Sequence, residues 1–317
     1  MSMGDSVQWV HIPVLAAEVA EFLSEVTPLK RLIDGTLGNG GHSRILLEKN
    51  PELEILGIDR DEAALERAGA VLADFGSRFT AVHGEFADLD KIAWEHGWDQ
   101  VDAVLLDIGV SSPQIDDPLR GFSFRGDGPL DMRMDRTQKL TASRVVNFYS
   151  EDELFRIFRD YGELRESRQL ARAIVQAREV RPLASTADLT AICDRVLRKK
   201  KPGQLPSPTL VFQALRIEVN GELAQLARGL AAAQNVLRDN GRLAVISFHS
   251  LEDRIVKNFM RDAARSCICP PTLPVCVCNH QAQFKLPVRG VVTASDEELD
   301  SNRRAACAKL RIADRIR

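Results

Sequence analysis

Residues 29–43 read LKRLIDGTLGNGGHS, and this stretch decides the fold. A short apolar run leads to Asp34 and into a turn with four glycines, and a helical pattern follows from Ser43 to Asn50. Glycines at such a point let the backbone turn tightly and approach a ligand closely, and a helix N-terminus favours negative charge. The stretch therefore predicts a strand, a ligand-binding turn and a helix.

The same pattern repeats along the first hundred residues. Apolar runs at residues 53–58, 79–82 and 101–106 predict further strands, and residues 61–75 follow a helical period that ends at Gly76. Strands that alternate with helices are typical of βαβ units in a parallel sheet with helices on both faces.

A long irregular segment, from Gly109 to about Asn147, interrupts this alternation, and we predict an ordered lid or binding loop there. Helical patterns fill residues 150–220, with Ser150 and Ser185 as candidate caps, before a helix and a strand return. The expected fold class is α/β, with a Rossmann-like sheet and an inserted small helical domain. The expected domains are residues 1–135 and 217–317 for the sheet and 136–216 for the insertion.

The composition is that of a globular protein, with 317 residues, 44% hydrophobic, 27% charged and a mean hydropathy of -0.16. These values exclude a collagen-like, coiled-coil or disordered chain. No window approaches the roughly 18 apolar residues of a membrane span, and no signal peptide is visible. We therefore expect no membrane partner and a cytoplasmic location.

The net charge of -3 conceals a basic middle region. Residues 136–216 hold 16 Lys/Arg against 9 Asp/Glu, and the run Arg198–Lys201 is part of this excess. Such a region suggests a polyanion partner, although solvated helix faces, with cations favoured at a helix C-terminus, would give the same count.

Acidic residues end three of the predicted strands: Asp34, Asp59 and Asp107. The carboxyl ends of strands in an open α/β sheet meet at one crevice, where Asp59 can accept both hydroxyls of a ribose and Phe86 can cover an adenine face. The turn lacks the G-x-G-x-x-G spacing of a pyrophosphate site. A carboxylate before it suits a cationic ligand, so a nucleoside with a cationic tail, S-adenosylmethionine, fits best.

Long motifs in this chain closely resemble the RsmH (also called MraW) family of bacterial methyltransferases. They are DGTLGNGGHS (34–43), LLDIGVSSPQ (105–114), the stretch from Arg120 through Asp135, and ISFHSLEDR (246–254). The resemblance implies a class I methyltransferase fold. It also implies that the enzyme methylates the exocyclic N4 amine of a decoding-centre cytosine in 16S rRNA, in the small ribosomal subunit.

The resemblance also implies specific S-adenosylmethionine contacts, of which His42 and Gln114 come from it alone. The full set is Gly40, Gly41, His42, Asp59, Phe86, Asp107 and Gln114. The chain departs from the family pattern at Ser207–Leu210 and Arg304–Cys307, where it loses an arginine each time. Whether RNA contacts are lost there, and whether the protein forms a dimer, stays open.

Asp107 is the candidate catalytic residue. The cytosine amine is a weak nucleophile because its lone pair is delocalised, so an acceptor for its N–H bonds and a close approach to the methyl donor would assist transfer. The alternative is that Asp107 contacts only the cofactor. Phe122 and Phe124 could stack on the flipped base, with Arg120, Arg125, Arg133 and Arg136 near phosphates, or could pack the loop onto the sheet.

Two features favour other interpretations. Ser247, His249 and Ser250 lack the G-x-S-x-G elbow of a hydrolase, and Ser250 is expected to cap the helix that starts at Leu251. Clustered cysteines (Cys267, Cys269, Cys276 and Cys278) suggest zinc, but their C-x-C spacing is not the usual one, so we expect no metal and a reduced loop.

Two other functions remain open at this stage. A non-catalytic nucleotide-binding module would need the same turn but not the elaborate segment from Gly109 to Asp135, and a methyltransferase of DNA or protein would share the cofactor site.

Overall fold

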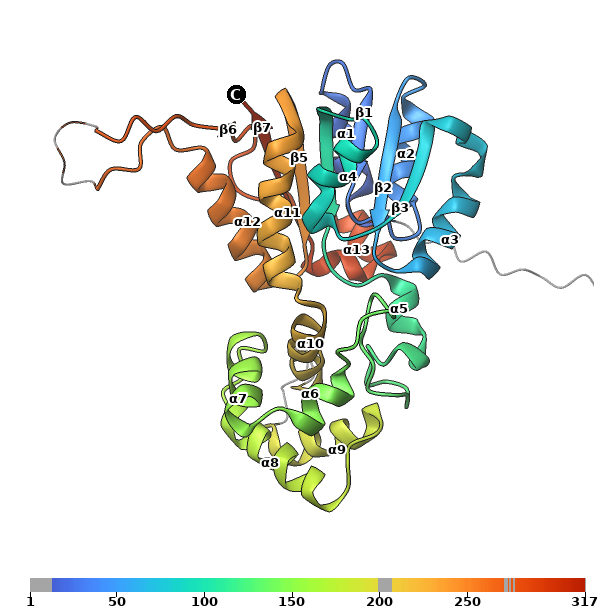
Figure 1. The fold of residues 1–317 in the computed structure, drawn as a ribbon, viewed down its shortest axis with the longest axis vertical. Coiled ribbons are helices and arrows are strands. Elements are labelled where there is room, and N and C mark those ends of the chain that lie inside the picture. The colour runs from blue at the N-terminus through green and yellow to red at the C-terminus, as the bar shows by residue number, and fades with distance from the viewer. Residues whose placement is uncertain (1–12, 199–206, 271–272, 274, 276, 317) are drawn as a thin grey trace, which may run out of the picture. The chain divides into compact units, whose positions relative to one another are not determined.

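The computed structural model describes residues 13–198, 207–270, 273, 275 and 277–316. The chain forms two compact units (Figure 1). Residues 1–109 and 227–317 form the first, which we call the sheet unit, and residues 110–226 form the second, the helical unit. Among the described residues, no helix is both long and apolar enough to cross a membrane.

The sheet unit contains a seven-stranded sheet in the order β3-β2-β1-β4-β5-β7-β6. The first five strands in this order are parallel, whereas β7 runs antiparallel to β5 and to β6. The strands are β1 (Arg31–Asp34), β2 (Glu54–Asp59), β3 (Phe79–His83), β4 (Val101–Asp107), β5 (Leu237–Ser247), β6 (Phe284–Lys285) and β7 (Lys309–Arg315).

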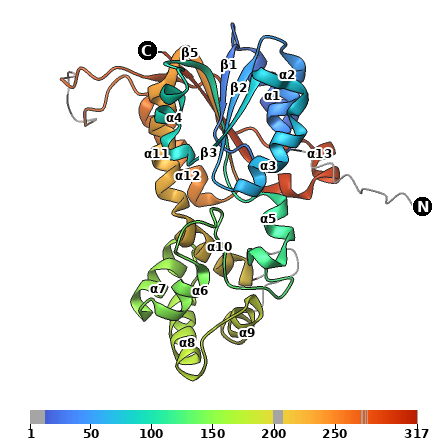
Figure 2. The same ribbon diagram turned by 45° about the vertical axis from the view of Figure 1, so that its right-hand side comes forward.

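Helices cover both faces of this sheet. Figures 1 and 2 show α1, α2 and α3 on one side and α4, α11 and α12 on the other. The helices are α1 (Ala16–Ser24), α2 (Gly41–Lys49), α3 (Glu62–Val71), α4 (Leu89–Glu95), α11 (Glu222–Val236), α12 (Ser250–Ala263) and α13 (Asp296–Ser301), with short 3-10 turns η1 (Ala73–Arg78), η2 (Phe86–Asp88) and η4 (Arg303–Cys307).

The parallel strands form where their sequence is continuously apolar. Leu32 and Ile33 in β1 and residues 103–106 in β4 are completely buried, as expected when helices cover both faces. The predicted βαβ pattern is confirmed, but β5 begins at Leu237 rather than at Leu243. The sequence gave no sign of β7, because charged side chains interrupt its apolar residues. One of them, Asp314, forms a buried ion pair with Arg242 at 2.6 Å.

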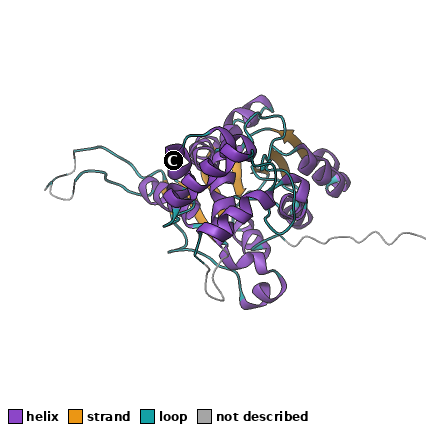
Figure 3. Cartoon of the chain, turned by 90° about the horizontal axis from the view of Figure 1, so that it is seen from below, coloured by secondary structure: helices purple, strands orange, loops and turns teal. Residues whose placement is uncertain are grey.

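The helical unit is built from five helices and a short N-terminal segment (Figure 3). Its elements are α5 (Ser112–Asp116), η3 (Pro118–Arg120), α6 (Ala142–Phe148), α7 (Glu151–Asp160), α8 (Ser167–Val180), α9 (Thr186–Val196) and α10 (Ser207–Asn220). The predicted caps are confirmed, since Ser150 Oγ accepts from Glu153 N at 3.3 Å and Ser185 Oγ accepts from Asp188 N at 3.4 Å.

The helical unit is wider than the insertion expected at residues 136–216. Phe122, Leu130 and Met132 are buried in the same apolar core as the helices, so the irregular segment belongs to this unit. The sequence did not reveal this because these apolar residues follow no regular period. Residues 110–226 hold 19 Lys/Arg and 16 Asp/Glu, a balance of only +3, and the charge argument for a polyanion partner is weakened accordingly.

Candidate functional site

The turn between β1 and α2 depends on glycine for its shape. Gly40 caps α2 with a φ of 78°, a left-handed conformation that favours glycine. A Cβ at Gly40 would lie 2.9 Å from Leu72 Cδ1, and one at Gly41 would lie 2.7 Å from Pro13 Cγ. Both glycines are therefore required by the local packing, and a tight turn with a bare backbone results.

Asp34 ends β1 directly before this turn and is buried, with 2% of its surface exposed. Its Oδ2 accepts a hydrogen bond from Ser43 Oγ at 2.7 Å, and its Oδ1 accepts from Thr36 N at 3.3 Å. Burial raises the pKa of Asp34 to about 6, although the Ser43 hydrogen bond and nearby His42 oppose this shift. A cation placed near this carboxyl would favour its ionised form.

Asp59 ends β2 and keeps part of its hydrogen-bonding capacity unused. Its Oδ2 accepts from Gly38 N at 2.8 Å and its Oδ1 accepts from Asp61 N at 2.9 Å. A carboxylate offers about four acceptor positions, so each oxygen can still accept a hydroxyl. Burial raises the pKa of Asp59, because two amide donors do not replace its full hydration. Two further donors would stabilise the charge.

Phe86 follows β3 and begins η2. Its half-buried ring packs against α11 at Gly229, where a Cβ would overlap with the ring. Gly229 therefore makes room for the aromatic side chain. The ring has a structural contact on one edge, and its partial exposure leaves area for a ligand.

Asp107 ends β4 beside His42, the second residue of α2. The Asp107 N–H donates to Thr36 Oγ1 at 2.5 Å, and Asp107 Oδ2 lies 3.6 Å from His42 Nε2. Two buried atoms, Asp107 Oδ1 and His42 Nε2, find no hydrogen-bond partner among the described residues. Because buried polar atoms are nearly always paired in native proteins, these two mark a place for a polar ligand.

The end of β5 lies along the same sheet edge, beside the end of β4. The expectation that Ser250 caps the next helix is wrong, because α12 already begins at Ser250 and His249 is its cap. Glu252, which is fully buried, accepts from Phe248 N at 2.9 Å and from His249 N at 3.2 Å. The H-x-x-E spacing, a capping box with histidine in place of serine, was the signal for this arrangement.

The structure brings six of the seven predicted cofactor residues to one edge of the sheet unit: Gly40, Gly41, His42, Asp59, Phe86 and Asp107. Gln114 belongs to the helical unit, where its Oε1 accepts from Ser111 N at 3.0 Å in the capping box of α5. Its contact with the cofactor stays a prediction. Sequence reasoning missed Thr36 and Ser43, which hold Asp107 and Asp34 in place.

The aromatic residues of the irregular segment pack inside the helical unit. Phe122 is only 8% exposed, and Phe124 meets Phe212 edge to face at 5.8 Å. The interpretation that these rings pack onto the sheet is therefore wrong, and Phe122 is too buried to stack on a base. Arg120 is buried as well, and its Nη2 donates to the carbonyls of Arg133 at 2.9 Å and Met134 at 3.1 Å.

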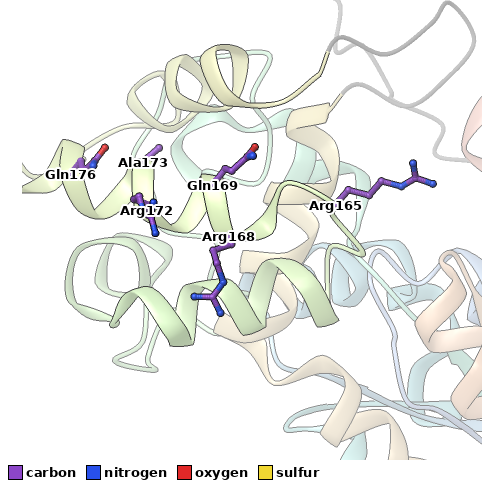
Figure 4. A pocket seen from close by; sticks show the side chains of 6 residues that line it. All are labelled: Arg165, Arg168, Gln169, Arg172, Ala173 and Gln176. Carbon is purple, nitrogen blue, oxygen red and sulfur yellow. The ribbon is translucent and has the colours of Figure 1, made fainter.

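A basic face on α8 is the main cationic surface among the described residues of the helical unit. Figure 4 shows an open hollow of about 400 Å³ lined by Arg165, Arg168 and Arg172. Arg168 Nη1 lies 3.4 Å from Asp152, and Arg172 Nε lies 3.7 Å from Glu151. Of the predicted basic run, Arg198 lies 3.5 Å from Glu166, while Lys199, Lys200 and Lys201 are outside the described residues.

The donor set fits S-adenosylmethionine. Asp59 retains acceptors for two hydroxyls, the Asp34 and Asp107 carboxyls suit a cationic group, and two buried polar atoms await a partner. Together with the 3-2-1-4-5-7-6 strand order, this site defines a class I S-adenosylmethionine-dependent methyltransferase.

Comparison with known proteins identifies the group within this class. The model of the MraW methylase family matches residues 8–316, and the chain belongs to that family. A curated relative from Carboxydothermus hydrogenoformans, named ribosomal RNA small subunit methyltransferase H, is 47% identical over 98% of this chain and 99% of its own length. One of the same name from Syntrophotalea carbinolica is 48% identical over 96% and 98%.

Among solved structures, an rRNA methylase from Streptococcus thermophilus is similar, with 12% or less in sequence terms. Its identity is 10%, its TM-score is 0.44, and the match covers 97% of this chain and 99% of that one.

Proposed function

We propose that this enzyme transfers a methyl group from S-adenosylmethionine to the exocyclic N4 amine of a decoding-centre cytosine in 16S rRNA. The name of the curated relatives, ribosomal RNA small subunit methyltransferase H, supports a small-subunit rRNA substrate. The observation that carries the reaction is the buried, unpartnered Asp107 Oδ1 at the end of β4, a hydrogen-bond acceptor beside the predicted cofactor residues.

The cofactor would be held by residues of several elements. Asp59 would accept the ribose hydroxyls, Phe86 would contact the adenine, and Gly40, Gly41 and His42 would border the cationic portion, with Gln114 as a further contact. Asp34 stabilises the positive charge without touching the reacting atoms, because Ser43 and Thr36 already occupy its oxygens.

S-adenosylmethionine supplies an electrophilic methyl group on a sulfonium, and the carbon–sulfur bond breaks as a carbon–nitrogen bond forms. The cytosine amine loses one proton in this exchange. Asp107 accepts a hydrogen bond from that amine N–H, which favours a pyramidal nitrogen with an available lone pair. The chain contributes chiefly by orientation, since a held amine and donor can recover several kcal/mol, up to about 7–11 in ideal cases.

RNA would be bound largely through its phosphates, and the basic face of α8 supplies cations for this. Arg168 and Arg172 face only exposed carboxylates, from which a phosphate can displace them at little cost. At one of the two positions that depart from the family pattern, Leu210 packs against the helical core. The proposed substrate places the enzyme in the cytoplasm, where small subunits assemble, and we propose that a monomer suffices for cofactor binding.

The proposed function is tested with small ribosomal subunits from a bacterial strain that lacks its own enzyme of this family. These subunits, naked 16S rRNA, DNA and a protein mixture are each incubated with the purified protein and labelled S-adenosylmethionine. Digestion to nucleosides and mass spectrometry should reveal N4-methylcytidine at one position of the rRNA. Label in another nucleoside, in DNA or in protein, or no label at all, would contradict the assignment.

A further inference from the structure

Three cysteines gather in the segment between α12 and β6, away from the strand ends. The sulfur atoms of Cys267, Cys269 and Cys278 all lie within 4.8 Å of one another, and Cys267 Sγ is 3.8 Å from Cys278 Sγ. The segment follows α12, whose 14 residues span about 21 Å, so the cluster is far along this helix from His249.

The spacing of the sulfurs matches a tetrahedral metal site. With Zn–S bonds of about 2.3 Å, two sulfurs on one zinc ion lie about 3.8 Å apart. A disulfide would require about 2.05 Å between the sulfurs. The separation of Cys267 and Cys278 therefore agrees with two ligands of one ion and not with a covalent bond between them.

Backbone amides surround these sulfurs as they surround metal-bound thiolates. Ile268 N donates to Cys278 Sγ at 3.5 Å, Cys269 N donates to Cys267 Sγ at 3.4 Å, and Val277 N donates to Cys269 Sγ at 3.4 Å. Each of the three sulfurs thus accepts one amide hydrogen bond. Hydrogen bonds of this kind favour the charged thiolate, the form that binds metals, and orient it.

Apolar burial does not hold this segment together. Its described aliphatic side chains are largely exposed, with values of 58% for Ile268, 47% for Leu273, 69% for Val275 and 72% for Val277. At its base, Gln283 N donates to Ala263 O at 2.7 Å and closes the segment. A segment that returns on itself without a core needs another source of stability, and a structural metal ion commonly supplies it.

We propose that Cys267, Cys269 and Cys278 bind a structural zinc ion that organises the segment. Zinc replaces the thiol protons, which leave to solvent, so that three thiolates bind the ion. Soft sulfur ligands at tetrahedral distances select zinc over magnesium or calcium. Cys276 lies outside the described residues, and the three described thiolates are sufficient for the inference.

The other described cysteines provide controls. Cys307 is exposed and lies outside the cluster. Cys193 is buried in the core of the helical unit, and burial raises the pKa of its thiol to about 12, so it does not offer a thiolate. Cys307→Ser is therefore the matched control for the replacement of a cluster cysteine.

The test measures metal content of the full-length protein purified from zinc-supplemented medium with a reductant present. Elemental analysis should find one zinc ion per chain in the wild type and in Cys307→Ser, and less than about a tenth of this in Cys267→Ser and Cys278→Ser. Cobalt added to the metal-free protein should produce the visible absorption of tetrahedral cobalt thiolate. Limited proteolysis should cleave residues 266–279 faster in the metal-free protein.

S-adenosylmethionine binding by the cysteine variants shows whether they remain folded. Wild-type protein without zinc would overturn the inference, as would equal zinc in the cluster variants and in Cys307→Ser. A Cys267–Cys278 disulfide, detected by mass spectrometry in place of bound metal, would also overturn it and would identify the pair as a redox element.

Discussion

The strand ends of the sheet unit and residues 118–135 of the helical unit are both rich in charged and aromatic side chains, but they use them differently. At the strand ends, Asp59 retains spare acceptor positions and Asp107 Oδ1 has no partner among the described residues. In residues 118–135, the Arg120 guanidinium donates to two carbonyls, and Arg133 forms two side-chain hydrogen bonds with Asp131, at 2.7 and 2.8 Å.

This difference separates groups that serve a ligand from groups that serve the fold. Hydrogen-bond capacity that the protein itself leaves unused is costly unless a ligand completes it. Capacity that is already satisfied contributes to a rigid local structure. The sequence motifs alone did not distinguish the two regions, because both contain the same residue types.

The largest expected effect concerns Asp107. Asp107→Asn should retain most of the cofactor affinity, while the rate of methyl transfer falls by about 10²–10³, because the stronger acceptor is needed mainly in the transition state. Single-turnover methylation of small subunits at saturating S-adenosylmethionine measures this. A rate within about threefold of wild type, less than ~0.7 kcal/mol in barrier, would show that Asp107 only binds the cofactor.

Asp59→Ala should weaken S-adenosylmethionine binding by about 1–3 kcal/mol, the cost of lost charge-assisted hydrogen bonds. The matched control is Asp61→Ala. Asp61 caps α3 by accepting from Ala63 N at 3.2 Å, so its removal should lower stability but leave the affinity unchanged. Calorimetric titration of both variants decides, and equal losses of affinity would argue against a ribose contact at Asp59.

Arg120→Met should lower the stability of the helical unit by roughly 1–3 kcal/mol, since two carbonyls lose their donor. Arg125, which is exposed in the same segment, provides the control, and Arg125→Met should change stability little. Thermal denaturation followed by circular dichroism measures both. If Arg120→Met unfolds like wild type but binds RNA poorly, Arg120 serves the substrate and the comparison fails.

The pH dependence of cofactor binding should report on Asp34. Its pKa is about 6, and Ser43, Thr36, His42 and Asp107 are the groups that face it. A cationic ligand favours the ionised carboxylate, so affinity should rise as the pH increases to about 6. Below that value it should fall by up to about tenfold per pH unit. Titration between about pH 5 and 8 should show this in wild type and a flatter profile in Asp34→Asn. Identical profiles would assign the dependence to another group.

Much of the sheet unit could be predicted from the sequence, for a physical reason. Parallel strands covered on both faces are continuous apolar runs, and the glycine turn and the acidic strand ends stand directly beside them. Strand β7 escaped prediction because the Arg242–Asp314 ion pair places a charge inside it, and a single strand sequence does not reveal its distant partner.

The candidate site was predictable as far as its local chemistry reached. Asp34, Asp59, Phe86 and Asp107 follow from their positions at or after strand ends, whereas His42 and Gln114 came only from the resemblance to a family. The burial of Arg120 and Phe122 was not predictable, since it depends on long-range packing with the helices and on carbonyls more than ten residues away. The extent of the helical unit was missed for the same reason.

The central claim is that the strand ends of the sheet unit bind the cofactor while residues 118–135 hold the helical unit together. Hydrogen–deuterium exchange with and without S-adenosylmethionine tests it most directly. The account predicts slower exchange on cofactor binding at residues 35–42, 57–61 and 84–88, and unchanged exchange at residues 118–135. Slower exchange at residues 118–135, with none at the glycine turn and strand ends, would contradict it.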